Sequence, residues 1–356
     1  MRKGWEYKRL DECANIEYGT RVVQKKDSGT LYPVYGGGGE TFRMDKFNRE
    51  DCLIVARFAM SRRCVRFVNG KFFLNDSGLS VKAGDKLYQS YLNYNIISLN
   101  DDIYHLGKGA AQRNLDVKSF KKLTIAIPPQ STQLAIVSEL DKINELIRLK
   151  KEQLKDFDNL AQSLFYEMFG DPVENEKGWE VKKLIEVSSL INGRAYKQNE
   201  LLSEGKYKVL RVGNFFTNSN FYYSNLELED EKYCYKGDLL FAWSASFGAF
   251  IWDEDKTIFH YHIWRVLFDK AILDIHYYQY LLNTMTSFFM NDVHGIGMVH
   301  LTKSGMEQYE LPLPPLPLQR LFAQRIEQIE REKSEVQKSI QDLETLLASR
   351  MQYWFE

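Results

Sequence analysis

The sequence predicts an α+β fold in which two β-rich domains are joined by two long antiparallel helices that form a coiled coil. Three repeated features predict this fold. The stretch GWEYKRL at residues 4–10 recurs as GWEVKKL at residues 178–184. A Pro-Pro turn occurs as IPPQSTQ (127–133) and again as LPPLPLQ (313–319), and a long helical pattern follows each copy. The chain therefore contains one unit twice, as a pseudo-twofold internal repeat.

The two copies match at their ends and diverge in their middle. Near the GWE motif the matching residues are 174 positions apart, and near the Pro-Pro turn they are 186 apart. The difference requires an insertion between the matched ends. A period of this length excludes a solenoid, whose repeats span about 20–50 residues. We infer a tandem duplication of one unit that is close to half the chain in length.

The motifs divide the chain into four segments. The first β-rich domain is expected at residues 1–129, and the first long helix with its linker at 130–177. The second β-rich domain is expected at 178–313, and the second long helix at 314–356. Short apolar runs such as CLIVARF and TIFHYHIWRVLF, separated by Gly, Asn and Asp, favour strands. One short helix per copy is expected near LYQSYLN and HYYQYLLN.

The apolar residues after each Pro-Pro turn are spaced alternately by three and four positions. This spacing keeps an apolar seam on one side of a helix with about 3.5 residues per turn, as a coiled coil requires. Since one such helix cannot bury its own seam, the two helices are expected to pair antiparallel. The alternative is that each helix folds back onto its own domain as part of the core. The expected seam residues are Ile143, Ile147, Leu154, Phe157, Leu164, Ile329, Val336, Ile340, Leu343 and Leu347.

Composition and cysteine usage favour a globular protein of the cytoplasm. Hydrophobic residues make up 44% of the chain and charged residues 27%, as in ordinary globular domains. The first residues lack the apolar segment of a signal peptide, and no apolar run approaches the roughly 18 residues of a membrane span. The four cysteines include no CxxC pair, so neither a zinc site nor a disulfide framework is indicated. No membrane partner and no metal are expected.

The charge is unevenly distributed, although the net charge is only −1. Residues 1–130 contain 22 Lys and Arg against 14 Asp and Glu, whereas residues 178–310 contain 13 against 17. The first segment has the electrostatic character of a polyanion binder. In the acidic second segment, any contact with a polyanion must come from a local patch.

The motifs and their order resemble the specificity subunit of type I restriction-modification systems. They are the GWE-x-K-[KR]-L start, the Gly-rich segment GKGAAQRNL or GIGMVHL, and the PPxxxQ turn that leads into a long helix. Each motif is weak by itself, but their ordered repetition covers essentially the whole chain. The resemblance implies that each β-rich domain is a target-recognition domain for one half of a bipartite site in double-stranded DNA.

The same resemblance implies partners and a non-catalytic role. The helices are expected to set the spacing between half-sites and to dock two methyltransferase (modification) subunits, with restriction/translocase subunits joining through the complex. S-adenosylmethionine, ATP and Mg²⁺ are expected in those partners, and no cofactor in this chain. The sequence agrees, because it has no NPP[YF] or DPPY tetrapeptide of the amino-methyltransferases.

Cationic and amide side chains of the first domain are the leading candidates for DNA contact. Arginine can bind phosphate, or the O6 and N7 atoms of guanine, with two donors. The alternative for each candidate is a solvated face or a plain connection between strands. YGGGGE (residues 35–40) either approaches DNA closely or forms a tight turn. The candidates are Arg21, Lys25, Lys26, Arg57, Arg62, Arg63, Arg66, Lys108, Gln112, Arg113 and Asn114.

The second domain offers fewer candidates. Three of them lie where Thr20, Val22 and Val23 lie in the first copy, and the others lie in the aromatic stretch RVGNFFTNSNFYY. The candidates are Arg194, Tyr196, Lys197, Arg211, Asn214 and Asn218, with Asn220, Ser244, Ser246, His260 and His262 as weaker ones.

Two other classes of function stay open at the level of sequence. A stand-alone endonuclease would use Asp238, Glu254 and Lys256, since acidic groups can hold Mg²⁺, but the first copy has no equivalent. A coiled-coil adaptor would bind only protein, and the basic first domain argues against it. His260 and His262 share one face of an expected strand without a third metal ligand.

Overall fold

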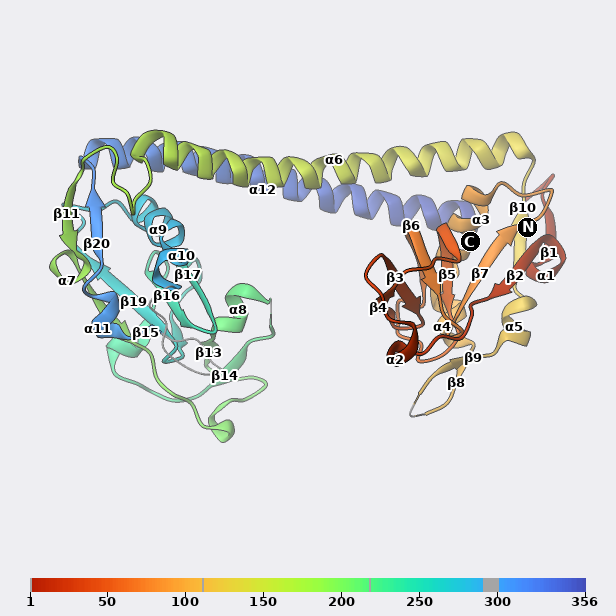
Figure 1. The fold of residues 1–356 in the computed structure, drawn as a ribbon, viewed down its shortest axis with the longest axis horizontal. Coiled ribbons are helices and arrows are strands. Elements are labelled where there is room, and N and C mark those ends of the chain that lie inside the picture. The colour runs from red at the N-terminus through yellow and green to blue at the C-terminus, as the bar shows by residue number, and fades with distance from the viewer. Residues whose placement is uncertain (1, 111, 218, 291–300) are drawn as a thin grey trace. The chain divides into compact units, whose positions relative to one another are not determined.

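The computed structural model describes residues 2–110, 112–217, 219–290 and 301–356. The chain forms two compact units, one of residues 1–152 with 337–356 and the other of residues 153–336. Each unit combines β-sheets with parts of both long helices, which confirms the α+β prediction (Figure 1).

The first domain is built on a six-stranded mixed sheet with the strand order β2-β7-β5-β6-β3-β4. Neighbouring strands pair antiparallel except β3 and β6, which pair parallel. The sheet strands are β2 (Ala14–Tyr18), β3 (Tyr32–Gly36), β4 (Gly39–Met44), β5 (Arg49–Ala56), β6 (Val65–Leu74) and β7 (Gly78–Ala83). The remaining elements are α1 (Leu10–Cys13), α2 (Gln24–Asp27), α3 (Gln89–Ser98), α4 (Asn100–His105), β8 (Gly107–Lys108), β9 (Asn114–Leu115) and α5 (Val117–Lys121).

The second domain contains two four-stranded sheets, with the orders β12-β19-β16-β17 and β14-β13-β18-β15. The first is antiparallel throughout, whereas β13 and β18 pair parallel in the second. The strands are β12 (Ser188–Asn192), β13 (Tyr207–Leu210), β14 (Tyr222–Ser224), β15 (Tyr233–Cys234), β16 (Leu239–Ser244), β17 (Ser246–Ile251), β18 (Thr257–Phe259) and β19 (Ile263–Phe268). The helices are α7 (Leu184–Val187), α8 (Val212–Phe216), α9 (Ile275–Thr284), α10 (Thr286–Phe289) and α11 (Lys303–Met306), with short 3₁₀ turns at Gln198–Glu200 and Asp230–Lys232.

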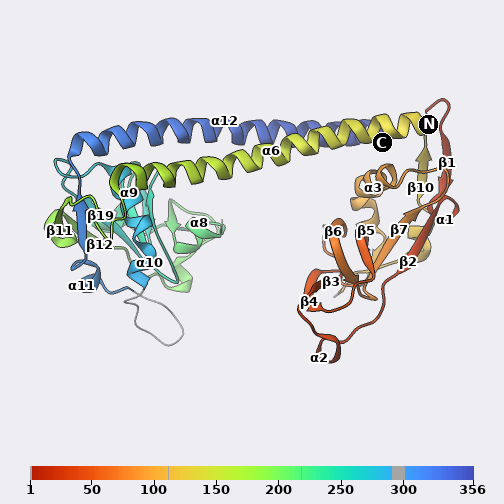
Figure 2. The same cartoon turned by 45° about the horizontal axis from the view of Figure 1, so that its top comes forward.

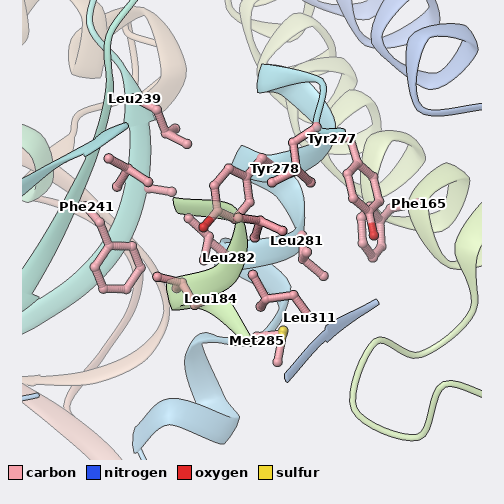
Figure 3. Packing of buried hydrophobic residues seen from close by; sticks show 14 of the residues in the cluster. Phe165, Leu184, Leu239, Phe241, Tyr277, Tyr278, Leu281, Leu282, Met285 and Leu311 are labelled. Atoms are coloured by element: carbon pink, nitrogen blue, oxygen red, sulfur yellow. The ribbon is translucent and has the colours of Figure 1, made fainter. Parts of the chain in front are cut away.

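The short helix expected in each copy is present as α3 and α9, and it connects the sheet to a long helix. In the second unit, α9 packs between the strand β16 and the long helix α6 (Gln130–Phe169), as Figure 3 shows. Tyr277 and Tyr278 are fully buried there. The Tyr277 ring stacks on Phe165 of α6, with centroids 5.9 Å apart. One apolar core therefore joins the second domain to the helix.

The GWE motifs form the strands that close each domain. Each pairs antiparallel with the strand just before the Pro-Pro turn, and the leucine that ends the motif, Leu10 or Leu184, is fully buried. The matched ends of each repeat unit therefore contact one another, which explains why they match. The pairs are β1 (Glu6–Arg9) with β10 (Thr124–Ile127), and β11 (Glu180–Lys183) with β20 (Glu310–Leu313).

A buried glutamine joins each domain to the long helix that follows it. The Gln133 side chain accepts the Tyr88 N–H at 2.9 Å and donates to the carbonyls of Lys86 and Pro128, both at 2.9 Å. Both Gln133 and Gln319 are fully buried. Gln319 accepts the Asp274 N–H at 2.8 Å and donates to the carbonyls of Ile272 at 3.0 Å and Pro314 at 2.7 Å, each contact 186 residues after its counterpart. We call these two sets of contacts the glutamine anchors.

The antiparallel pairing of α6 with α12 (Leu316–Phe355) is confirmed within each unit (Figures 1 and 2). In the first unit, Arg350 near the end of α12 pairs with Glu139 near the start of α6. In the second, Lys333 on the seam of α12 pairs with Asp158 of α6 at 2.8 Å. No helix in the described part of the chain is long and apolar enough to cross a membrane.

The seam residues lie away from solvent along both helices. The two ends of α6 also fit the alternative in which a long helix forms part of a domain core. Ile136 and Leu140 belong to the core of the first domain, and Phe165 and Phe169 belong to the core of the second. Seam and domain core are thus continuous within each unit. Buried seam residues are Ile143, Ile147, Leu164, Ile329, Val336 and Ile340, and half-buried ones are Leu154, Phe157, Leu343 and Leu347.

The glutamine anchors predict a specific loss of stability. Replacing the buried Gln133 with Leu removes the acceptor of the part-buried Tyr88 N–H and the donor to two carbonyls, and we expect the free energy of unfolding to fall by about 1–3 kcal/mol. Gln319→Leu should have the same effect through the Asp274 N–H. Urea denaturation measures the change. The control is Gln130→Leu, at an exposed position in the first turn of α6. An equal effect of the control and the anchor variants would contradict the anchor role.

Candidate nucleic-acid interface

Three loops of the first domain meet at one end of its six-stranded sheet. They are the turn between β3 and β4 (36–39), the segment between β5 and β6 (57–64), and the β8–β9 hairpin (107–115). Backbone hydrogen bonds join the last two, from Leu115 N–H to Arg57 O at 2.8 Å and from Met60 N–H to Arg113 O at 2.9 Å. We call this surface the loop face. In Figure 1, β8 lies on the side of the domain away from α6.

Arginines on the loop face lie against aromatic rings. The Arg57 guanidinium lies 4.4 Å from the ring centroid of Phe58 and 5.1 Å from that of Tyr18. The Arg62 and Arg113 guanidinium groups share one aromatic partner, and lie 5.5 and 4.6 Å from the centroid of the Tyr104 ring. Cation–π contacts hold a guanidinium plane in place without using its N–H groups, although one N–H of Arg57 donates to Asp76 O and one of Arg113 to Gly107 O. Sequence reasoning missed these aromatic partners, although Phe58 is next to Arg57 in the sequence.

Arg66 connects the loop face to the glycine-rich turn. Its guanidinium donates to the carbonyls of Gly37 at 3.3 Å and Arg63 at 2.9 Å. Burial and the neighbouring Arg63 charge lower the pKa of Arg66. The turn itself packs tightly, because a Cβ on Gly37 would lie 2.0 Å from the carbonyl oxygen of Phe58. Close packing within the domain therefore accounts for the glycine at position 37.

The other first-domain candidates differ in how they are engaged. Lys108 pairs with Asp116 at 2.6 Å, and this contact together with the Ser119 N–H lowers the pKa of Asp116 to about 2. The Asn114 side chain accepts the Ala59 N–H at 3.3 Å. The remaining candidates, Arg21, Lys25 and Lys26 around α2, and Gln112 and Arg63 in the loops, are exposed.

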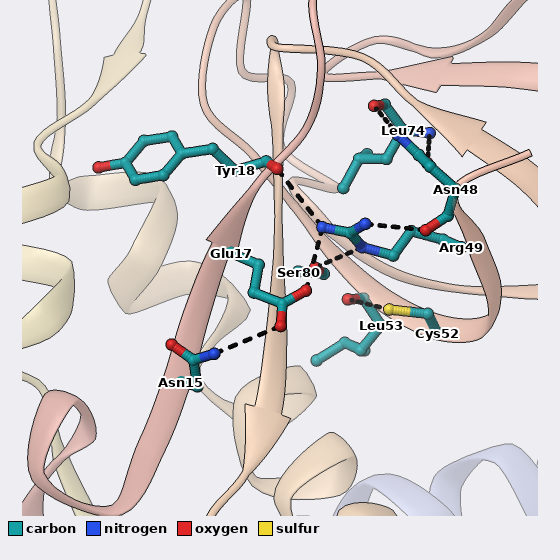
Figure 4. Close-up of polar contacts among 9 residues, drawn as sticks. All are labelled: Asn15, Glu17, Tyr18, Asn48, Arg49, Cys52, Leu53, Leu74 and Ser80. Atoms are coloured by element: carbon teal, nitrogen blue, oxygen red, sulfur yellow. Dashed lines mark hydrogen bonds and ion pairs between the residues drawn. The ribbon is translucent and has the colours of Figure 1, made fainter.

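An arginine outside the candidate set shows that charge alone does not identify a contact. Arg49 at the start of β5 pairs with Glu17 at 3.1 Å and donates to Ser80 at 2.9 Å, as Figure 4 shows. Its side chain is 19% exposed and joins β2, β5 and β7. This arginine stabilises the sheet.

In the second domain, an internal acidic partner holds the first candidate. Arg194 forms two hydrogen bonds to Glu200, at 3.0 and 2.8 Å. The hydrogen bonds from Arg194 and from the Lys197 N–H lower the pKa of Glu200 to about 2. The Tyr196 ring lies beneath the Arg194 guanidinium and is half-buried. Lys197 is the exposed member of this group.

Arg211 lines a groove of about 990 Å³ in the second domain. Its guanidinium lies 4.2 Å from the Tyr222 ring, and its buried Nε has no hydrogen-bond partner. Asn214 accepts the Arg211 N–H at 2.8 Å and donates to Ser219 O at 2.6 Å, so its amide is engaged within the chain. Asn220 also lines the groove, and Asn218 lies outside the described residues.

Aromatic rings gather beside this groove. His260 lies between Tyr196 and His262, with ring centroids 6.3 and 4.8 Å away. Tyr261 contacts His262 and Trp243, with centroids 3.9 and 5.9 Å away. We call the surface formed by Tyr196, His260, Tyr261, His262 and Trp243 the aromatic face. Of the weaker candidates Ser244 and Ser246, the first is buried. Residues 291–300, which carry most of the second glycine-rich motif, lie outside the described residues.

Both copies of the repeat match one known family. Its model, described as the type I restriction modification DNA specificity domain, covers residues 2–156 and 176–345. The chain belongs to this family. It is a type I restriction-modification specificity subunit with two recognition domains.

Relatives of this specificity subunit match over most of their length. A putative type I restriction enzyme specificity subunit of Haemophilus influenzae is 24% identical over 345 residues, which cover 91% of this chain and 87% of that protein. A specificity subunit of Methanocaldococcus jannaschii is 22% identical over 323 residues, or 78% of this chain and 75% of that protein.

Solved structures share the fold. The S subunit of a type I restriction-modification system from M. genitalium has a TM-score of 0.56 at 15% identity, with 98% of this chain and 95% of that chain covered. A chain solved in a study of complex assembly and conformational transition of the type I restriction-modification system has a TM-score of 0.61 at 18% identity, with 100% and 98% covered.

The residues of the endonuclease alternative are engaged separately in this specificity subunit. Asp238 accepts the Tyr235 N–H at 2.8 Å, Glu254 pairs with Lys208, and the Lys256 ammonium lies 3.8 Å from the Tyr233 ring centroid. Among the described residues, no group of three or more His, Cys, Asp or Glu side chains could hold a metal ion.

The half-buried position of His260 predicts a pH dependence of the specificity subunit's stability. Burial, with the charges of His262 and Arg211, lowers the pKa of His260 from 6.5 to about 4. The unfolded chain therefore binds more protons between these two pH values, and the stability of the second domain falls as the pH decreases through this window. We expect the stability of His260→Gln relative to the wild type to rise between pH 7 and pH 4.

Urea denaturation at several pH values tests this. The matched control is His105→Gln, since His105 is exposed on α4. A pH-independent difference between His260→Gln and the wild type would show that the pKa of His260 is the same in the folded and the unfolded chain, which would contradict this prediction.

Proposed function

We propose that this specificity subunit binds a bipartite site in double-stranded DNA, with the loop face of the first domain at one half-site and the aromatic face of the second domain at the other. The loop face carries this proposal. Segments far apart in the sequence bring Arg57, Arg62, Arg66 and Arg113 together there, on the domain with the excess of positive charge. Phosphate contacts from such residues position a protein on DNA, and arginines next to base edges specify sequence.

The subunit itself carries no catalytic site in this proposal. Its partners supply the chemistry: two methyltransferase subunits that bind S-adenosylmethionine, and restriction/translocase subunits that use ATP and Mg²⁺. The long helices set the spacing between the half-sites and dock the methyltransferases. The complex functions in the cytoplasm, where its DNA target lies.

The outer surface of the long helices supports two equivalent docking sites. Asp156, Leu160 and Ser163 lie on one face of α6, since they are four and three residues apart. The residues 186 positions later on α12 are Asp342, Leu346 and Ser349, which are identical. All six are exposed, with Leu160 at 52% and Leu346 at 45%. The seam residues next to them differ, as the half-buried Phe157 and Leu343 do. On this outer surface the two helices therefore carry identical residues, whereas along the seam most residues differ. Two identical surfaces fit two copies of one partner.

This docking surface predicts a stepwise change in stoichiometry. We expect Leu160→Glu and Leu346→Glu each to reduce the complex from two bound methyltransferase subunits to one, and the double variant to bind none. Native mass spectrometry of the assembled complex measures the ratio. Leu146→Glu is the control, because Leu146 is similarly exposed but its counterpart on α12 is already Glu332. Retention of two partners by both single variants would place the docking surface elsewhere.

The loop face predicts the salt dependence of DNA binding. Each neutralised phosphate contributes about 0.9 to the slope of log affinity against log salt concentration. Replacing the exposed Arg62 and Arg63 with Ala should therefore weaken binding by the methyltransferase complex and reduce this slope by up to about 2. Arg9→Ala is the control, since Arg9 is exposed on β1 and pairs with Asp11 at 2.7 Å. The base requirements of the second half-site should stay unchanged.

Methylation sequencing of DNA from cells that contain the complex tests the proposal as a whole. The expected result is one bipartite motif in which changes to the loop face affect a single half-site. A motif whose two halves change together in the Arg62 and Arg63 variants would contradict the assignment of one half-site to each domain.

A further inference from the structure

One backbone position is the same in both recognition domains but carries different side chains. Arg57 follows β5, and Trp243, 186 residues later, lies near the end of β16. The Leu115 N–H donates to the Arg57 carbonyl at 2.8 Å, and the Leu301 N–H donates to the Trp243 carbonyl at 3.2 Å. Leu115 and Leu301 are also 186 residues apart.

A second observation confirms the equivalence independently of these hydrogen bonds. Two residues after each position lies an alanine in the left-handed backbone region, Ala59 with φ of 50° and Ala245 with φ of 63°. Alanine rarely adopts this conformation, and only four described non-glycine residues do so in this chain. Both domains therefore have the same strained turn at this place. The turn fixes the backbone position of Arg57 in one domain and of Trp243 in the other, while the side chain differs.

In the first domain this position presents a guanidinium between aromatic rings. Phe58 and Tyr18, whose rings contact Arg57, are 36% and 47% exposed. Nη1 donates to the Asp76 carbonyl at 3.2 Å, which fixes one edge of the group. Arg57 is half-buried, whereas Arg62 and Arg63 are exposed. A guanidinium fixed in orientation suits the paired O6 and N7 acceptors of guanine, which need two donors in one plane.

In the second domain the same position presents an indole ring. The Trp243 N–H donates to the Tyr261 carbonyl at 2.9 Å, so the protein uses this donor. The ring stacks on Trp264 at 5.2 Å and contacts the partly exposed Tyr261 ring at its edge. Trp243 is half-buried. The exposed part of its ring offers apolar carbon to DNA, and the apolar feature in the major groove is the thymine methyl group.

We propose that Arg57 and Trp243 are equivalent specificity-determining residues, Arg57 for a G·C pair in the first half-site and Trp243 for a pair with a thymine methyl group in the second. The proposal rests on the proposed DNA recognition and adds to it the residue in each domain that selects a base. A fixed backbone with an exchangeable side chain allows one fold to select different bases.

The test is methylation sequencing with the assembled methyltransferase complex that contains the full-length subunit. Arg57→Ala should relax one G·C position of the first half-site by about 5- to 100-fold, the range of one bidentate base contact. Arg57→Lys keeps the charge but loses the planar pair of donors, and should relax the same position. Trp243→Phe keeps an aromatic ring in the core but shortens its reach, and should relax one position of the second half-site only.

The outcomes distinguish failure of the proposed DNA recognition from failure of the base-selecting role of Arg57 and Trp243. If the wild-type complex methylates no bipartite motif, the proposed function fails. If the wild-type motif is present but Arg57→Ala and Arg57→Lys lower methylation uniformly without changing base preference, Arg57 contacts phosphate and this inference is overturned. A change in the first half-site caused by Trp243→Phe, or in the second caused by either Arg57 variant, would also overturn it. Thermal melting of each variant complex establishes that it is folded.

Discussion

The glutamine anchors are the contacts on which each unit depends. Gln133 and Gln319 lie where three structural parts meet: the turn before the short helix, the Pro-Pro segment, and the first turn of the long helix. Each side chain is itself buried and bonds to one backbone N–H and two carbonyl groups, of which the proline carbonyl is also buried. Because the amide joins both sides of the turn, the direction in which the helix leaves the domain is fixed. Ile136 and Leu140 can then enter the domain core from the next turns of α6.

The sequence predicted the parts of the fold that obey local or repeated patterns. The alternating spacing of three and four identified both long helices and their antiparallel pairing, since the seam is a property of the sequence alone. The GWE and PPxxxQ motifs marked two segments of each copy that pair with one another in the fold. The divergent middles were not predictable in the same way. The main sheet of the first copy has six strands, whereas the second copy has two four-stranded sheets.

The candidate site was harder to predict, because residue type does not identify a residue's partner. Arg49 begins β5 and Arg57 directly follows it, eight positions later. The first joins three strands through Glu17 and Ser80, whereas the second lies between exposed aromatic rings. Arg194 was a candidate by its position after a glycine turn, but Glu200 lies close enough to hold its guanidinium. The count of charges predicted that the first domain is the more cationic one. It could not predict which of its Lys and Arg side chains are exposed. The left-handed alanines were also missed, since backbone strain of this kind has no sequence signal when the residue is alanine.

The placement of these contacts separates stability from recognition within each domain. The closing strand pair, the glutamine anchor and the helix seam lie at the end of the domain that adjoins α6 and α12, and they bury apolar surface in both copies. In the first domain the loop face lies away from α6 (Figure 1). Its side chains contact solvent, aromatic rings and backbone carbonyls, so their replacement removes little buried apolar surface. Changes on that face therefore cost little stability, whereas a change at Gln133 or Leu10 affects the whole unit. This difference in energetic cost explains how a duplicated domain can keep the same ends and the same helix pair while the surfaces of its two copies become a cationic face and an aromatic one.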